Sequence, residues 1–330
     1  MSELVEAKST ISNDHPLVTF ALFAYNQEKY IREAVEGALS QTYSPLQIIL
    51  SDDCSSDNTF EIMQTMVKNY SGSSEIILNR NTHNYGISSH VNRVMEFAKG
   101  ELIVMAAGDD ISLPHRVARS VEILRENPLA SMVGFKDITI DKDSKEIFRV
   151  SNNIQNNEYY FVKLSDYLSG KTPHLSGASR CFNRKLFDTF NELNDLCPAE
   201  DVPYLLRGLM LGYGIISPEP GIKYRLHGNN LSGPRSLHAM NFLELKKQYQ
   251  QDLNLAVSKG IINPVSAKKI ECWIEGNYQR CIFFSGLYYS QDKMKYFTTK
   301  GILNKNIKFR EKLVIAKRLI DPRRPFAFDA

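Results

Sequence analysis

Short apolar runs that alternate with amphipathic segments fill the first third of this chain, and this alternation limits its possible folds more than any other feature. Apolar side chains recur at helical spacing within residues 29–39, residues 59–69 predict a second helix, and Val91 and Val94 mark one face of a third. Strands that are joined by crossover helices form parallel sheets. We therefore expect a doubly wound α/β unit, whose strands are residues 17–23, 47–51, 75–78 and 102–106.

Acidic pairs follow two of these expected strands. Asp52 and Asp53 follow the second, and Asp109 and Asp110 follow the fourth, directly after Gly108. Adjacent carboxylates repel each other unless a cation or a hydrogen-bond donor meets them. Because ligands bind beyond the carboxyl ends of the strands in such sheets, we expect these carboxylates at one binding mouth.

These acids suit the binding of a nucleotide. A diphosphate leaving group needs its charge neutralised, and a hard divalent cation held through oxygen can do this. Asp110 is the candidate ligand, and Asp109 is close enough in sequence to contact a ribose hydroxyl or a metal-bound water; a solvated loop end is the alternative for both. Asp53 could accept hydrogen bonds from a base edge or a sugar, or could help to cap the helix that begins near Thr59.

Two later segments could carry acid-base or metal chemistry. Glu200 and Asp201 precede an apolar helix, where acids commonly serve the helix N-terminus, but a carboxylate there could also take the proton from an acceptor hydroxyl. His227 lies in a Gly- and Asn-rich loop that also supplies Arg225. It could ligate a metal or bind phosphate, or it could be an ordinary surface or packed histidine.

Composition and absent motifs exclude several other classes of protein. The sequence has no G-x-x-x-x-G-K-[ST] loop, no G-x-G-x-x-G after the first strand, no G-x-S-x-G elbow and no H-E-x-x-H. Its five cysteines are scattered without a C-x-x-C pair, which argues against a disulfide framework or a thiolate zinc site. No apolar run reaches the roughly 18 residues of a membrane span and residues 1–14 are polar, so we expect a cytoplasmic protein.

The end of the chain is strongly basic. From Lys295 onward there are 10 bases and 3 acids, so this segment carries 10 − 3 = +7, whereas the whole chain carries only +3. Base-stacking aromatics are not interleaved with these charges, so nucleic acid is a poor fit. Residues 311–320 place Leu313, Ala316 and Ile320 on one helical face, which suits an anionic membrane surface; a solvated helix or an oligomer contact is the alternative.

The middle of the chain predicts further α/β elements. Helices are expected over residues 116–126, 183–190 and 201–211, and a strand over 131–135. Proline and glycine within residues 218–221 predict a break in the chain.

Taken together, the ordered motifs resemble those of family 2 glycosyltransferases, and the resemblance runs from Leu17 to about residue 233. It implies a GT-A type, Rossmann-like fold with a mostly parallel central sheet flanked by helices and a mainly helical C-terminal extension. The motifs are Ala24–Ile31, Ser40–Tyr43, Ile49–Thr59, Asn84–Gly86, Asn92, Gly100–Glu101, Gly108–Asp110, Ala199–Asp201 and Tyr224–Ser232. The implied parts are an N-terminal extension (1–15), a glycosyltransferase domain (16–239) with a nucleotide-binding half (16–113) and an acceptor-binding half (114–239), and a helical C-terminal region (240–330).

The resemblance also implies roles for single residues. Those that would bind the nucleotide sugar are Phe23, Tyr25, Glu28, Asp53 and Asp109. Asp110 matches the last acid of the family's D-x-D motif and, with His227, would hold Mn²⁺ or Mg²⁺ on the diphosphate, while Asp201 matches the catalytic base of inverting members. The residues placed near the acceptor or the diphosphate are Gly177, Glu200 and Arg225.

The implied activity is the transfer of a sugar from a UDP- or dTDP-linked donor to a saccharide or lipid-linked acceptor, in the synthesis of a bacterial surface polysaccharide. A homo-oligomer and a peripheral contact of the basic C-terminal region with the inner face of the membrane are further expectations. A non-catalytic nucleotide-sugar-binding or signalling domain is the alternative. Gly108 stands at the first position of the D-x-D triplet, so a third carboxylate is absent from the expected site.

Overall fold

The computed structural model describes residues 15–147, 158–173, 175–228 and 230–320, so nearly all of the expected N-terminal extension lies outside the described residues. The chain divides into two compact units, one ending at Leu226 and the other beginning at His227. This division precedes the expected boundary at residue 239. The reason is that the short helix α8 (Pro234–Ala239) packs with the second unit, where the backbone oxygen of His238 accepts a hydrogen bond from Ser285 Oγ at 2.8 Å.

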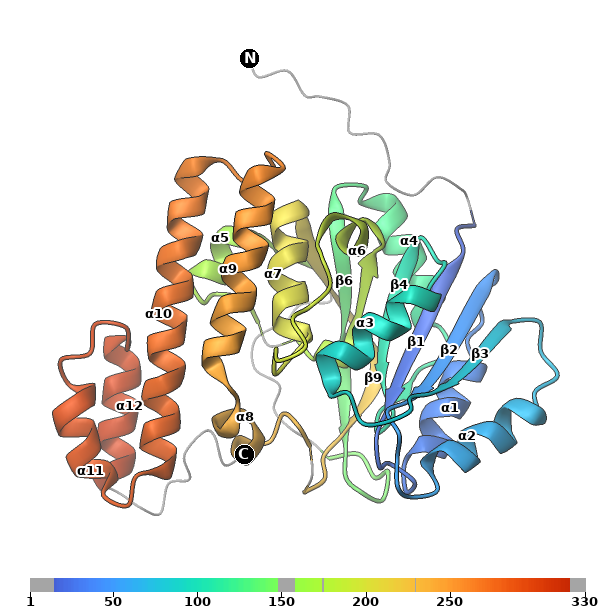
Figure 1. Ribbon diagram of the computed structural model, residues 1–330, viewed down its shortest axis with the longest axis horizontal. Helices are drawn as coiled ribbons and strands as arrows, with labels where there is room; N and C mark the ends of the chain where they lie inside the picture. The colour runs from blue at the N-terminus through green and yellow to red at the C-terminus, as the bar shows by residue number, and fades with distance from the viewer. Residues whose placement is uncertain (1–14, 148–157, 174, 229, 321–330) are drawn as a thin grey trace. The chain divides into compact units, whose positions relative to one another are not determined.

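A nine-stranded sheet forms the centre of the first unit (Figure 1). Its strand order is β3-β2-β1-β4-β8-β6-β9-β5, with β7 beside β9. Neighbouring strands are parallel from β3 to β4, β8 is antiparallel to both of its neighbours, and β6 and β9 are parallel. The strands are β1 (Val18–Ala24), β2 (Leu46–Asp52), β3 (Glu75–Arg80), β4 (Leu102–Ala107), β5 (Ile111–Ser112), β6 (Ala130–Ile140), β7 (Tyr160–Val162), β8 (Arg180–Asn183) and β9 (Tyr213–Arg225). The expected fold is confirmed.

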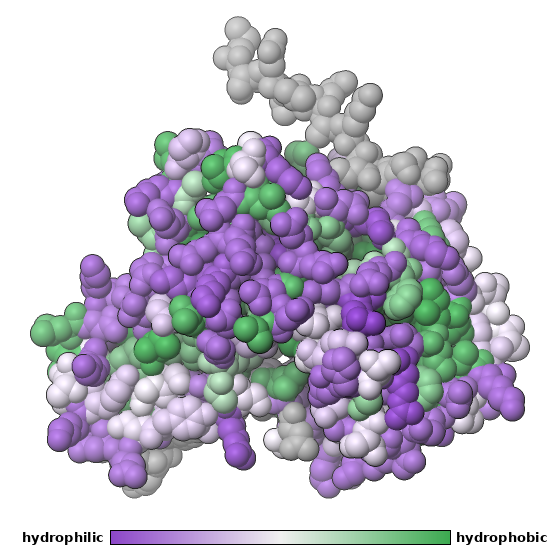
Figure 2. All heavy atoms as spheres, in the orientation of Figure 1, coloured by the Kyte–Doolittle hydropathy of each residue, from purple (hydrophilic) through white to green (hydrophobic). Residues whose placement is uncertain are grey.

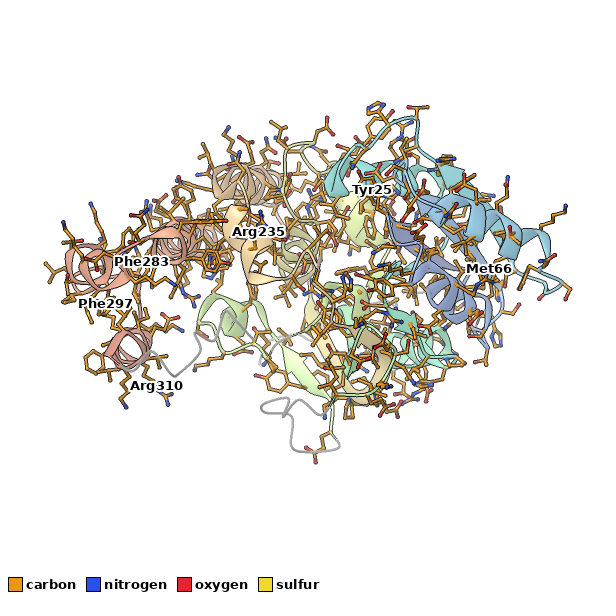
Figure 3. The ribbon with its side chains drawn as sticks, turned by 90° about the horizontal axis from the view of Figure 1, so that it is seen from below. Tyr25, Met66, Arg235, Phe283, Phe297 and Arg310 are labelled. Carbon is orange, nitrogen blue, oxygen red and sulfur yellow. The ribbon has the colours of Figure 1, made fainter. Side chains whose placement is uncertain are left out.

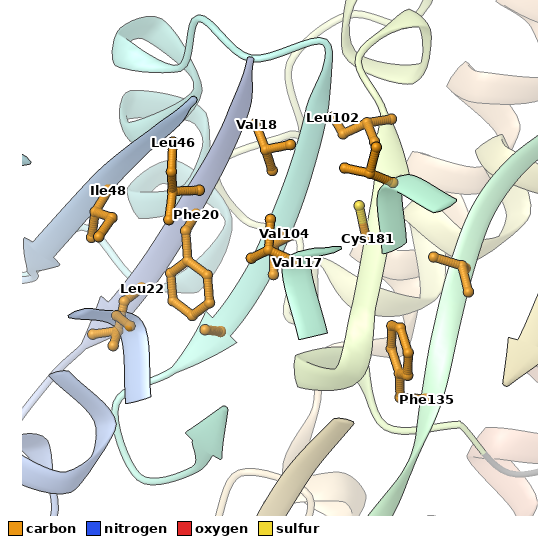
Figure 4. Close-up of a cluster of buried hydrophobic side chains, with 14 of the residues drawn as sticks. Val18, Phe20, Leu22, Leu46, Ile48, Leu102, Val104, Val117, Phe135 and Cys181 are labelled. Atoms are coloured by element: carbon orange, nitrogen blue, oxygen red, sulfur yellow. The ribbon is translucent and has the colours of Figure 1, made fainter. Parts of the chain in front are cut away.

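Helices cover both faces of this sheet. Phe20 of β1 packs with Val35 of α1 on one face, in the cluster drawn in Figure 4, and Ala21 packs with Val91 of α3 on the other. Because the central strands are buried on both faces, they appear in the sequence as continuous apolar runs. The helices of the first unit are α1 (Ile31–Leu39), α2 (Thr59–Lys68), α3 (Ile87–Phe97), α4 (Arg116–Glu126), α5 (Leu164–Leu168), α6 (Lys185–Thr189) and α7 (Asp201–Leu211), with a short 3₁₀ turn, η1 (Gly177–Ser179).

Two expected elements differ in the structure. Residues 183–190 were expected to be one helix, but Asn183 ends the strand β8, and α6 covers only Lys185–Thr189. The expected break over residues 218–221 is wrong as well, because β9 continues through them. The prolines are accommodated where the pairing of β9 with β6 shifts its register.

The described residues of the second unit are helical, as expected for the C-terminal extension. Its core is a cluster of Phe283, Phe284, Leu287, Phe297, Ile307 and Ile315. Across the described residues, no helix combines the length and the apolar character that crossing a membrane requires. Besides α8, the elements are α9 (Phe242–Ser258), α10 (Pro264–Tyr289), α11 (Lys293–Tyr296), the π-helical turn η2 (Phe297–Gly301) and α12 (Phe309–Ile320).

Candidate active site

The carboxyl ends of β1, β2 and β4 meet at one edge of the sheet. Phe23 of β1 lies opposite Ser51 of β2 and Ala107 of β4. The backbone bonding continues past the strands, because Asp53 N donates to Ala24 O at 2.9 Å and Gly108 N donates to Phe23 O at 2.8 Å. The strand-end acids therefore share one edge, as parallel pairing requires.

Asp53 holds the loop between β3 and α3. Its Oδ1 accepts hydrogen bonds from Asn81 Nδ2 at 2.7 Å and from Tyr85 N at 3.0 Å, and its Oδ2 accepts from Gly86 N at 3.0 Å. Gly86 has a positive φ of 79°, which a side chain would resist. Asp53 therefore does not cap α2; it fixes the Asn84–Gly86 motif beside the strand ends.

Asp52 and Asp57 have structural roles beside it. Asp52 is completely buried, and its Oδ2 accepts a hydrogen bond from Ser55 N at 2.9 Å and lies 3.6 Å from Arg80 Nε. Asp57 Oδ1 accepts from Thr59 N at 3.0 Å, at the start of α2. The N-terminus of α2 thus obtains its hydrogen-bond acceptor from Asp57. The carboxylate of Asp53 instead accepts hydrogen bonds from the loop that joins β3 to α3.

Two aromatic residues and one acid lie at the end of β1 and just after it. The ring of Phe23 meets the buried imidazole of His90 edge to face at 5.4 Å, whereas Tyr25 is 45% exposed and lies at the surface (Figure 3). Glu28 Oε2 accepts a hydrogen bond from Asn58 N at 3.1 Å. Burial lowers the pKa of His90 to about 4, so its ring is neutral at pH 7.

Asp109 and Asp110 have different surroundings at the end of β4. Asp109 is partly exposed, while Asp110 is 6% exposed and accepts a hydrogen bond on Oδ1 from Arg225 N at 2.8 Å. Burial raises the pKa of Asp110 well above the usual carboxyl range, and Asp109 raises it further, against the effects of the Arg225 N–H and of Arg116. A cation at Asp110 would relieve this cost of burial.

The donor set fits a divalent cation at this point. Oδ2 of Asp110 accepts no hydrogen bond from the described residues, so one hard oxygen is available. Among all the residues that the structure describes, no group of three or more His, Cys, Asp and Glu side chains is placed to hold a metal ion. Mg²⁺ is commonly held by one or two carboxylates together with substrate phosphates and water. The protein would supply Asp110, with Asp109 beside it.

Gly108, at the first position of the triplet, packs closely against the residues at the end of β1 and after it. A Cβ at this position would lie 2.4 Å from Gln27 Oε1 and 3.0 Å from Ala24 Cβ. The glycine therefore has a packing cause, because the loop after β1 lies directly against it.

Arg225 is a buried clamp between distant segments. Its Nε donates to Asp109 O and its Nη1 to Ser144 Oγ, both at 2.8 Å. Its Nη2 pairs with Glu33, and its guanidinium lies 4.8 Å from the centre of the Tyr30 ring. These contacts use the guanidinium to hold the protein itself, and the expected place of Arg225 near the acceptor or the diphosphate stays a prediction.

A second acidic group lies at the N-terminus of α7. Gly177 packs so closely on Asp201 that a Cβ on the glycine would lie 2.7 Å from Asp201 Cβ and 3.1 Å from its Oδ2. Arg180 Nη1 donates to Asp201 O at 2.5 Å, and Arg180 Nη2 lies 4.0 Å from Asp201 Oδ2. Burial, with a smaller effect of Asp201, raises the pKa of Glu200 to about 7. The structure therefore brings together three of the expected residues, Gly177, Glu200 and Asp201.

Arg116 was not expected, and it holds the backbone of β4 and of Arg180. It is fully buried at the start of α4, and its Nη2 donates to Met105 O at 2.7 Å and to Arg180 O at 3.2 Å. Its charge also acts on Asp110. A basic residue that opens an amphipathic helix usually lies at the surface, so no sequence signal marked Arg116 as buried.

His227 begins the second unit, two positions after Arg225 in the sequence. Its backbone N–H donates to Asn230 Oδ1 at 2.6 Å, which orders the turn that follows. Its expected role as a metal ligand stays a prediction.

A family model shows the family to which this fold belongs. The model for "Glycosyl transferase family 2" matches residues 19–190, which is more than half of the 330 residues and includes all the strand-end acids. The chain therefore belongs to glycosyl transferase family 2 and is a glycosyltransferase.

Curated relatives agree with this assignment. An uncharacterized glycosyltransferase of Haemophilus influenzae is 26% identical over 91% of this chain and 97% of its own length. The putative glycosyltransferase EpsE of Bacillus subtilis is 31% identical, over 39% of this chain and 46% of EpsE. An Escherichia coli protein, "UDP-Glc:alpha-D-GlcNAc-diphosphoundecaprenol beta-1,3-glucosyltransferase WfaP", is 30% identical over 38% of this chain and 48% of WfaP. The matches to EpsE and WfaP thus span less than half of those proteins.

Solved structures share the fold. TarS of S. aureus, in complex with UDP, has a TM-score of 0.58 at 13% identity, over 93% of this chain and 81% of TarS. The mannosyltransferase PcManGT of Pyrobaculum calidifontis, in complex with GDP-Man and Mn²⁺, has a TM-score of 0.55 at 16% identity, over 97% and 92% of the two chains.

Proposed function

We propose that this glycosyltransferase moves a sugar from a UDP- or dTDP-linked donor to a hydroxyl of a saccharide or lipid-linked acceptor, in surface polysaccharide synthesis. Transfer would invert the anomeric centre and depend on Mn²⁺ or Mg²⁺. The observation that carries this proposal is a pair of acidic groups, each with a buried arginine that acts on it. Asp109 and Asp110 follow β4, where the charge of Arg116 acts on Asp110, and Asp201 begins α7, where Arg180 donates to its backbone oxygen. One group suits a diphosphate with its cation, and the other suits a hydroxyl.

The first group would bind the donor. Phe23 and Tyr25 offer aromatic faces to the base, Asp53 fixes the loop that borders it, and Asp109 is exposed enough to accept a ribose hydroxyl. The cation at Asp110 would neutralise the charge that develops on the diphosphate. UDP and UDP-GlcNAc occur in complexes of the structural neighbour TarS, which supports a nucleoside diphosphate donor.

The second group would activate the acceptor. As the acceptor oxygen attacks the anomeric carbon, its proton passes to a carboxylate oxygen of Asp201. The bond from the anomeric carbon to the β-phosphate oxygen breaks, and its electron pair leaves with the nucleoside diphosphate. The products are the glycosylated acceptor, the nucleoside diphosphate and one proton on Asp201, which solvent then removes. Attack from the face opposite the leaving group inverts the configuration.

Glu200 would assist Asp201 by keeping its proton in part of the molecules near neutral pH. Its pKa of about 7 means that the pair need not carry two negative charges at once. Arg180 Nη2 lies 4.0 Å from Asp201 Oδ2 and places a positive charge beside the second carboxylate. Asp201 is therefore the better base of the two.

A lipid-linked acceptor is proposed from the relatives. WfaP carries a diphosphoundecaprenol acceptor in its name, and it matches this chain over 127 residues. We extend this acceptor class to the present protein together with free saccharides.

A panel of nucleotide sugars tests the donor and the metal together. The melting temperature is measured with each compound, with and without Mn²⁺ or Mg²⁺; a ligand at 100 times its Kd stabilises by about 2.7 kcal/mol. We expect stabilisation by UDP- or dTDP-sugars that disappears with EDTA. If the melting temperature rises equally with and without EDTA, the metal has no part in donor binding. If NMR shows that the product retains the anomeric configuration of the donor, the inverting mechanism is wrong.

A further inference from the structure

The outer surface of α12 and the turn before it is apolar although it belongs to a helical unit with its own core. Leu303 is 92% exposed and Phe309 is 74% exposed. Ile302, Leu313 and Val314 are exposed by 45% to 49%. These five residues are the apolar patch. Figure 2 shows apolar side chains at the left edge of the view, where Figure 1 draws the turn beside α11 and α12.

The structure corrects the helical face expected for this segment. Ile315 is 3% exposed and packs in the core with Ala316 beside it, whereas Leu313 faces outward. Phe309, Leu313 and Lys317 are spaced at i, i+4 and i+8 and form one outward stripe. Figure 3 shows Arg310 on the side of α12 that faces away from Phe283 and Phe297.

Basic side chains surround the apolar patch. Lys305, Lys308, Arg310 and Lys317 are all exposed. Residues 293–320 contain 9 bases and one acid, which gives 9 − 1 = +8. The single acid, Glu311, is already paired with Arg280 at 2.5 Å. The surface therefore offers positive charge and apolar side chains together, and the acid of this segment is held in an ion pair.

We propose that this surface docks on a membrane leaflet that carries anionic lipid headgroups. Apolar side chains enter the boundary between headgroups and acyl chains, while Lys and Arg remain with the phosphates. Docking of a second copy would place two segments of net charge +8 against each other, and these charges repel. Nucleic acid would need aromatic stacking faces, but four of the five patch residues are aliphatic. Docking does not depend on the glycosyl transfer proposed above, since it involves only the second unit.

Vesicle sedimentation tests the docking with the full chain. Vesicles of phosphatidylcholine alone are compared with vesicles that contain about 30% phosphatidylglycerol, at low salt and at about 1 M NaCl, where the Debye length falls to about 3 Å. We expect binding only to the anionic vesicles, with most of it lost at high salt. Equal binding to both vesicle types, or no binding to either, overturns the proposal.

Two sets of variants separate charge from apolar contact. The triple variant Lys305→Gln, Arg310→Gln, Lys317→Gln should lower the partition coefficient about 100-fold, because each base contributes about fivefold near an anionic leaflet. The double variant Leu303→Ser, Phe309→Ser should lower it about tenfold or more. All five side chains are exposed, so the melting temperature should be unchanged.

Matched controls remove equal numbers of basic and of apolar side chains from other exposed positions. These are the triple variant Lys68→Gln, Lys142→Gln, Lys185→Gln and the double variant Leu129→Ser, Val265→Ser. If the controls reduce binding as much as the patch variants, the docking surface is elsewhere. Two other results would overturn the proposal that the surface binds a membrane. In both, vesicles do not bind, and the patch variants abolish either a dimer seen in sedimentation velocity or the retention of single-stranded RNA. The surface would then belong to that partner.

Discussion

Replacement of Arg225 by methionine should weaken both the fold and the proposed metal site. The guanidinium is 1% exposed and donates to Asp109 O and Ser144 Oγ at 2.8 Å and to Asp141 O at 3.3 Å. Each of these hydrogen bonds is worth about 1 kcal/mol, and the contact with the Tyr30 ring up to about 1 kcal/mol. The ion pair adds no more than about 1 kcal/mol, because its partner carboxylate is 42% exposed. Methionine keeps the aliphatic volume, so the expected loss is about 3 to 5 kcal/mol.

This loss should lower the melting temperature by about 10 °C. The effect on ligand binding is separate. The backbone N–H of Arg225 holds Asp110 Oδ1 at 2.8 Å, and its position depends on the side-chain clamp. Loosening this bond by about 1 kcal/mol should reduce the metal-dependent affinity for the nucleoside diphosphate fivefold to tenfold, as measured by calorimetry. Arg225→Lys should restore little, because a lysine cannot reproduce the planar fork.

Arg119→Met is the matched control. Arg119 also holds several partners, with Nε 3.0 Å from Glu219 Oε2 and Nη2 3.0 Å from Tyr159 OH, but none of them belongs to the candidate site. This variant should lose stability and keep its nucleotide affinity. The clamp has no role at the metal site if Arg225→Met binds the nucleotide as tightly as Arg119→Met does.

Four further changes test single residues. Asp201→Asn should lower kcat about 10²- to 10⁴-fold with unchanged donor binding; turnover at the parental rate would exclude it as the base. Asp110→Ala should abolish the gain in nucleotide affinity that Mn²⁺ or Mg²⁺ provides, and calorimetry that finds the gain intact contradicts its role. Gly177→Ala should lower kcat about 10- to 100-fold because its Cβ would displace Asp201, whereas Gly276→Ala, with its nearest atom at 3.6 Å, should change nothing. The pKa of Glu200 is about 7 in the folded state, against 4.5 for an ordinary glutamate, so the folded state binds the extra proton and the free energy of unfolding falls as pH rises from 4.5 to 7. Urea unfolding at pH 5 and pH 8 should therefore show a smaller fall in Glu200→Gln than in the parent protein.

Local pattern was enough to predict the nucleotide-binding half. The apolar runs and helical stripes predicted β1 to β4 and the helices between them, and parallel pairing then placed Asp53, Asp109 and Asp110 at one edge. The alternation of strands and helices is a local property, so the sequence contains it, whereas the pairing of β1 with β4 joins distant segments. Beyond residue 180 the pattern was weaker, because short strands such as β8 are flanked by helices and the prolines of β9 lie at register shifts.

The supports of the site could not be predicted in this way. Glu33 and Arg225 are 192 positions apart, and Asp110 and Arg225 are 115 apart. Whether an arginine is buried depends on the carbonyl groups and carboxylates that the fold gathers around it, and Arg116 has no neighbour in sequence that shows this. The same reason applies to Gly108, because its close packing against Gln27 and Ala24 becomes visible only in the folded chain.

The sequence by itself therefore determined the class of fold, the family and the edge of the sheet at which the acids gather, since these follow from periodicity and from the order of motifs. Only the tertiary structure decided what each acid contacts: Asp53 the β3 to α3 loop, Asp110 the Arg225 clamp and Asp201 the Gly177 turn. It also decided that Leu313 faces outward and Ala316 inward. Such contacts join residues that are remote along the chain, and they exist only after the backbone has brought those residues together.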